Sequence, residues 1–112
     1  MANTASVSDT AYVGPDAAVR DSAVVRDYAE VLGFAEVRDA AVVRDLAVVR
    51  DSAAVSGYAV IRDYAVVRDY AAVCDSAVVC NLAVVCDRAG VYGSALVGGR
   101  RVVGGIEAVG DP

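Results

Sequence analysis

The fold is decided by the stretch Ala41-Val42-Val43-Arg44-Asp45-Leu46, which returns almost unchanged as Ala65-Val66-Val67-Arg68-Asp69-Tyr70. A valine stands at every sixth position from Val7 to Val109, with Ile61 as the one replacement. An alanine stands two positions before each of these residues from Ala5 to Ala95. A fixed period that runs along a whole chain is typical of a solenoid, in which each repeat packs on its neighbours.

Each six-residue repeat, or hexad, has the pattern of a short strand followed by a corner. Its alanine and valine are two positions apart, so on an extended strand both side chains point to the same side. The position two after valine holds Asp eleven times, Gly five times, and Asn81 and Pro15 once each. These residue types favour turns. A helix is excluded because six residues rotate by about 600°, which would spread the valines over three faces.

The pattern Val-x-Asp/Gly-x-Ala-x resembles the hexapeptide repeat of left-handed β-helix proteins, over nearly all 112 residues. The resemblance implies an all-β fold, a left-handed parallel β-helix in the form of a triangular solenoid. Three hexads would make one coil, and every eighteenth residue would stack on its predecessor. Eighteen hexads then predict about six coils. The left-handed sense is implied by the resemblance alone.

The repeat weakens near the C-terminal end of the sequence. Arg101 and Glu107 take positions that hold alanine elsewhere, and glycine is doubled twice in the same region. A charged side chain that points into the core is costly unless it is paired or solvated. We therefore predict a single domain over residues 1–112, with regular coils over about 5–98 and an irregular tail over 99–112.

The columns formed by every eighteenth residue predict what each side of the prism carries. Two outward columns are rich in valine, and the third is small and smooth. Contiguous exposed apolar surface marks interaction sites. The sequence therefore predicts association between copies of the chain, through a valine-bearing face or through the open ends. The candidate association residues are Val24, Val42, Val60, Val78 and Leu96 in one column and Val48, Val66 and Val84 in another. Tyr28, Leu46, Tyr64 and Leu82 share a neighbouring column and are candidates for the rim of such an interface.

Two sets of potential metal ligands are present, and neither predicts a metal site. Asp9, Asp27, Asp45 and Asp63 share a corner column that could offer oxygen ligands to Ca²⁺. Neighbouring arginines already supply counter-charge, so turn formation is the favoured role. Cys74, Cys80 and Cys86 occupy one slot in three consecutive hexads and thus three corners of one coil, too far apart for a disulfide. We expect three exposed thiols and no zinc site.

The composition argues against catalysis and against several classes of partner. The net charge is −5, and each of the seven arginines that directly follow the core valine, or Ile61 in its place, precedes Asp, so no basic patch for nucleic acid is expected. The apolar stretches are too short to span a membrane, and the first residues do not resemble a signal peptide. Relatives implied by the resemblance include acyltransferases and γ-class carbonic anhydrases, which rely on histidine, and this chain has none.

The resulting expectation is a non-catalytic, self-associating scaffold in the cytoplasm, without a cofactor, a metal or a small-molecule substrate. Two alternatives remain open at this point. One is a degenerate or partial domain of the hexapeptide acyltransferase family. The other is a protein that forms filaments by stacking end to end.

Overall fold

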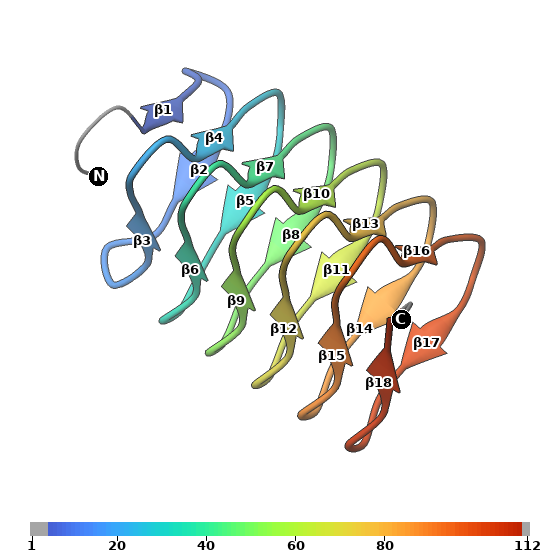
Figure 1. Ribbon diagram of the computed structural model, residues 1–112. Coiled ribbons are helices and arrows are strands. Elements are labelled where there is room, and N and C mark those ends of the chain that lie inside the picture. The colour runs from blue at the N-terminus through green and yellow to red at the C-terminus, as the bar shows by residue number, and fades with distance from the viewer. Residues whose placement is uncertain (1–4, 111–112) are drawn as a thin grey trace.

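The computed structural model describes residues 5–110, which form eighteen two-residue strands in three parallel sheets around one core (Figure 1). Consecutive strands belong to different sheets, so the chain visits the three sheets in turn and then begins the next coil. Among the described residues there is no helix of the length and apolar character needed to cross a membrane.

The three sheets each contain six strands, one from each coil. Sheet A consists of β1 (Ser6–Val7), β4 (Val24–Val25), β7 (Val42–Val43), β10 (Val60–Ile61), β13 (Val78–Val79) and β16 (Leu96–Val97). Sheet B consists of β2 (Tyr12–Val13), β5 (Glu30–Val31), β8 (Val48–Val49), β11 (Val66–Val67), β14 (Val84–Val85) and β17 (Val102–Val103). Sheet C consists of β3 (Ala18–Val19), β6 (Glu36–Val37), β9 (Ala54–Val55), β12 (Ala72–Val73), β15 (Gly90–Val91) and β18 (Ala108–Val109).

The strand register confirms the eighteen-residue stacking. Val60, for example, lies opposite Val42 on one side and Val78 on the other, and the same offset holds for every strand pair. The prediction of an all-β solenoid of about six coils is confirmed. Its left-handed sense stays a prediction.

The core consists of the alanine and valine of each hexad. Residues from Val19 to Val91 in these two slots are at most 1% exposed, whereas Val7 and Val13 at one end are partly exposed. A turn follows each strand from β1 to β17 and is closed by a backbone hydrogen bond, as where the N–H of Ala23 donates to the carbonyl of Arg20 at 3.2 Å. The interior is thus continuous along the stack and less covered at its ends.

The prediction of an irregular tail over 99–112 was wrong for residues 99–110. Strand β17 pairs with β14, and β18 pairs with β15, in the same register as the other coils. Gly99 and Gly105 take the left-handed corner conformation, with φ of 64° and 62°. Arg101 and Glu107 are tolerated because they lie at the open end, where both are exposed and form an ion pair of 3.4 Å. Residues 111 and 112 lie outside the described part of the chain.

Candidate functional site

The corner aspartates have a structural role that joins one coil to the next. Asp45 and Asp63 have φ of 61° and 62°, a left-handed conformation that Asp tolerates better than most residues. The carboxylate of Asp63 accepts a hydrogen bond of 3.0 Å from the N–H of Asn81, one coil further on. The same bond recurs at all three corners, with Asp21, Asp27, Asp39, Asp45, Asp51, Asp69, Asp75 and Asp87 as acceptors.

The arginines beside these aspartates neutralise them. Arg62 Nη1 lies 3.3 Å from Asp63 Oδ2, and Arg68 Nη1 lies 3.2 Å from the corresponding oxygen of Asp69. Sequence reasoning assigned turn formation to the aspartates but missed the hydrogen bond between coils. The signal was present, because aspartate recurs at spacings of eighteen residues.

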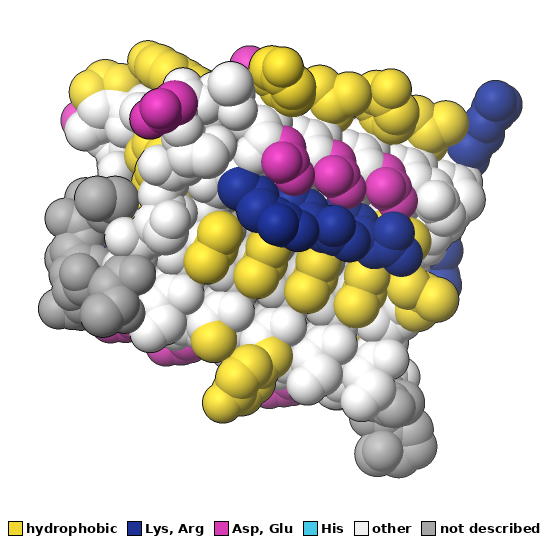
Figure 2. Space-filling model, turned by 90° about the horizontal axis from the view of Figure 1, so that it is seen from above, with side chains coloured by type: hydrophobic (Ala, Val, Ile, Leu, Met, Phe, Trp, Pro, Cys, Tyr) yellow, Lys and Arg dark blue, Asp and Glu magenta, His cyan; other side chains and the backbone are white. Residues whose placement is uncertain are grey.

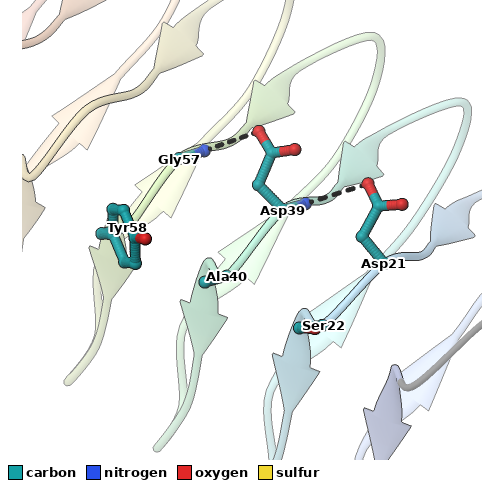
Figure 3. Close-up of a pocket in the computed structure, with 6 residues that line it drawn as sticks. All are labelled: Asp21, Ser22, Asp39, Ala40, Gly57 and Tyr58. Carbon is teal, nitrogen blue, oxygen red and sulfur yellow. Dashed lines mark hydrogen bonds between the residues drawn. The ribbon is translucent and has the colours of Figure 1, made fainter.

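A shallow groove of about 370 Å³ lies along one of these corners (Figure 3). Its lining includes the carboxylates of Asp21 and Asp39, and the ring of Tyr58 stands at one end. Asp21 accepts from the N–H of Asp39, and Asp39 accepts from the N–H of Gly57 at 2.9 Å. Both carboxylates therefore bind the backbone of the next coil, which is the structural role of the other corner aspartates.

Potential metal ligands of Asp69, Cys86 and Asp87 lie within 4.8 Å of one another. Their oxygens already have partners, since Asp69 accepts from the N–H of Asp87 at 3.1 Å and Asp87 accepts from the N–H of Gly105 at 2.8 Å. Arg68 adds a positive charge beside Asp69. The arrangement is therefore explained by coil stacking.

The prediction of three exposed thiols was wrong for Cys80 and Cys86, which are only 3% and 5% exposed. Cys74 is half-buried, and all three cysteines are free. The Sγ of Cys80 lies 3.2 Å from the place that a Cβ on Gly98 would occupy, so the thiol lies over the glycine of the next coil. Burial, reinforced by Asp75 in one case and Asp87 in the other, raises the pKa of Cys74 and Cys86 above that of an ordinary thiol.

The outward valines of sheet A form a single narrow row. Val24, Val42, Val60 and Val78 are half-buried, and Leu96 at the end is 65% exposed. Figure 2, seen from the side of β4, β7, β10 and β13, shows a row of hydrophobic side chains beside rows of arginine and aspartate. The row of residues on its other side is mostly small or polar: Ser22, Ala40, Tyr58, Ser76 and Ser94.

Sheet B carries the broader apolar surface, because two apolar rows run side by side along it. One row contains Val48, Val66 and Val84, which are half-buried, and the exposed Val102. The other contains Tyr28, Leu46, Tyr64 and Leu82, each at least 46% exposed. We call the surface formed by these eight residues the broad face. The structure thus brings the predicted rim residues together with one of the two predicted valine columns.

Sheet C presents small residues and paired charges. Its outward positions include Ala54, Ala72 and Gly90. Glu36 lies between Arg20 and Arg38, with a carboxylate oxygen 3.3 Å from a guanidinium nitrogen of each. The row beside these strands contains the exposed Phe34, Tyr70 and Ile106, but Ser52 and Arg88 interrupt it, so sheet C lacks the continuous pair of apolar rows found on sheet B.

Comparison with protein-family models, curated proteins and solved structures found no match to this chain.

Proposed function

We propose that this protein is a non-catalytic structural scaffold that associates with copies of itself through the broad face. The observation that carries the proposal is the pairing of two apolar rows on sheet B, with Tyr28, Tyr64 and Leu82 at least half exposed. Exposed contiguous apolar patches mark interaction sites in soluble proteins. Aromatic residues are also enriched in the centres of protein interfaces.

The rigidity of the prism supports a role in association. The valine row lies on strands whose backbone is hydrogen-bonded to the coils on both sides, as for Val66, which lies between Val48 and Val84. The tyrosine and leucine row lies in the preceding turns, which are also hydrogen-bonded between coils, as where the N–H of Leu46 donates to the carbonyl of Asp63 at 2.9 Å. A surface that is already ordered loses little conformational entropy when it binds. The broad face is therefore suited to packing against another flat surface.

The chemistry of the side chains supports a non-catalytic role. The chain has neither the histidine nor the lysine that would act as a base. A reactive cysteine needs a lowered pKa, whereas burial raises the pKa of Cys74 and Cys86. A cytoplasmic location is part of the proposal, because three free thiols fit a reducing compartment.

Stacking end to end into filaments is the second candidate, favoured by one specific feature. The first coil leaves strand edges unpaired on its outer side, and Val7 and Val13 there are partly exposed. The opposite end is different, because the exposed ion pair between Arg101 and Glu107 occupies slots that hold alanine elsewhere. Stacking this end on the apolar end of a second copy would bury both charged side chains, which is costly. We therefore favour association through the broad face.

The proposal is tested by the mass of the protein in solution. Light scattering after size exclusion, over a hundredfold range of concentration with reductant present, is expected to give a discrete small oligomer. A mass that grows without limit would favour the filament. A strict monomer at every concentration would overturn self-association.

A further inference from the structure

Two unpaired charges lie at opposite ends of the broad face. Glu30 precedes Val48 in the valine row, and Arg100 follows Leu82 in the tyrosine and leucine row. Within residues 5–110, neither side chain forms an ion pair. Glu36, the equivalent of Glu30 on sheet C, is held between two arginines.

The spacing of these charges allows them to pair with a second copy in only one orientation. Glu30 belongs to the second coil and Arg100 to the sixth, so they are four coil spacings apart, or roughly 19 Å at about 4.8 Å each. An antiparallel copy places its sixth coil against the second coil of the first. Both copies then bring Glu30 close to the partner's Arg100.

We propose that the broad face forms an antiparallel, face-to-face dimer whose two-fold axis passes through the fourth coil, at Tyr64 and Val66. This inference rests on the proposed function and adds the partner's orientation and register. In this register Tyr64 lies against the partner's Tyr64, and Leu46 lies against the partner's Leu82. A two-fold interface of this kind is self-complementary.

A parallel pair is less favourable on the same surface. Each coil would face the same coil of its partner, which places the two Glu30 side chains near each other. Arg100 would be roughly 19 Å from the partner's Glu30 and without an opposite charge. Like charges brought together at an interface select against that arrangement.

The area available is enough for a small dimer interface. The molecule measures 33 × 23 × 20 Å, so a face of 33 by 20 Å has an area of roughly 660 Å². Five of the six coils overlap in the proposed register, so roughly 550 Å² is covered on each copy. The total of roughly 1,100 Å² exceeds the roughly 1,000 Å² expected of a biological interface.

The register is tested by disulfide trapping. The native Cys74, Cys80 and Cys86 are first replaced by alanine, and Leu46→Cys and Leu82→Cys are introduced in separate chains. Mixing the two chains under mild oxidation is expected to give a disulfide-linked heterodimer, at least tenfold more than either chain forms with itself. Tyr64→Cys alone is expected to form a homodimer. Equal yields from Leu46→Cys alone and from the mixture would overturn the antiparallel register.

Charge reversal provides the second test. Glu30→Arg and Arg100→Glu are each expected to weaken dimerisation by about tenfold, because two ion pairs per dimer become repulsive. The double variant is expected to restore it. A dimer that is indifferent to all three variants overturns the register and leaves the proposed function standing, whereas a monomeric wild-type protein overturns both.

Discussion

The corner hydrogen bond predicts that Asp63→Ala destabilises the solenoid. The variant removes the carboxylate that accepts from the N–H of Asn81 at 3.0 Å. A hydrogen bond to a charged group contributes about 1.5–3 kcal/mol when buried. The Asp63 side chain is 31% exposed, so we take about 1 kcal/mol for this bond. Alanine at φ of 62° adds about 1–2 kcal/mol of backbone strain. The expected loss is about 2–3 kcal/mol.

A series of variants at this position separates the two contributions. Asp63→Gly removes the hydrogen bond without the strain, so its loss is expected to be about 1 kcal/mol smaller than that of Asp63→Ala. Asp63→Asn keeps an acceptor and tolerates the left-handed conformation, and is expected to remain within about 1 kcal/mol of wild type. The free energy of unfolding is measured by urea titration followed by circular dichroism.

The matched control is Asp16→Ala, which removes the same charge from an exposed position that forms no bond between coils. It is expected to change stability by less than about 0.5 kcal/mol. Equal losses for Asp63→Ala and Asp63→Gly would refute the argument from strain. A loss below about 0.5 kcal/mol for Asp63→Ala would refute the role of the carboxylate.

Three further predictions concern the ends and the thiols. Arg101→Ala combined with Glu107→Ala restores the alanines of the repeat and uncovers the core at the C-terminal end, so end-to-end stacking should give a mass that increases with concentration in light scattering. An unchanged mass would contradict the role of this ion pair in opposing stacking. The raised pKa of Cys74 and Cys86 means that the folded chain holds these protons to higher pH than the unfolded chain. Stability should therefore fall above about pH 9 as the folded pKa values are passed. The midpoints of urea unfolding at pH 7.5 and pH 10 should differ less in the variant that carries both Cys74→Ala and Cys86→Ala than in the wild-type protein. Gly104→Ala would place a Cβ 3.0 Å from the Oδ2 of Asp87 and 3.3 Å from the Sγ of Cys86. It should cost about 1 kcal/mol in urea unfolding, with part of the loss recovered by Cys86→Ala; no recovery would contradict crowding by the thiol.

The six-residue period made the architecture predictable because one short pattern encodes both the core and the corner. Ala41 and Val43 indicated the buried side of a strand, and Asp45 indicated the turn, so the eighteen-residue register followed. The hydrogen bond from the next coil to each corner carboxylate was not predicted. It depends on the distance between stacked backbones, which the period alone does not give. The left-handed sense rests on the family resemblance.

The errors arose where the environment of a slot changes along the stack. Cys80 and Cys86 were expected to be exposed because their slot holds arginine in earlier coils. They are buried because small thiols lie over Gly98 and Gly104 of the following coil. Arg101 was read as a break because its slot points inward, but at the last coil that slot reaches solvent.

The candidate surface was only partly predictable. Sequence columns identified two valine rows of similar quality. Their difference lies in the neighbouring rows, since Tyr64 and Leu82 adjoin the valines of sheet B, whereas Ser76 adjoins those of sheet A. The structure shows which rows adjoin, because the row in each turn lies beside the outward row of the strand that follows it.

Self-association through the broad face is tested by comparing the masses of Val66→Lys and Val60→Lys by light scattering at one concentration. Both valines are half-buried and occupy the same slot in neighbouring hexads, one on sheet B and the other on sheet A. An interface on sheet B predicts that Val66→Lys is monomeric while Val60→Lys keeps the mass of the wild-type oligomer. An oligomer that survives Val66→Lys and dissociates with Val60→Lys would contradict it.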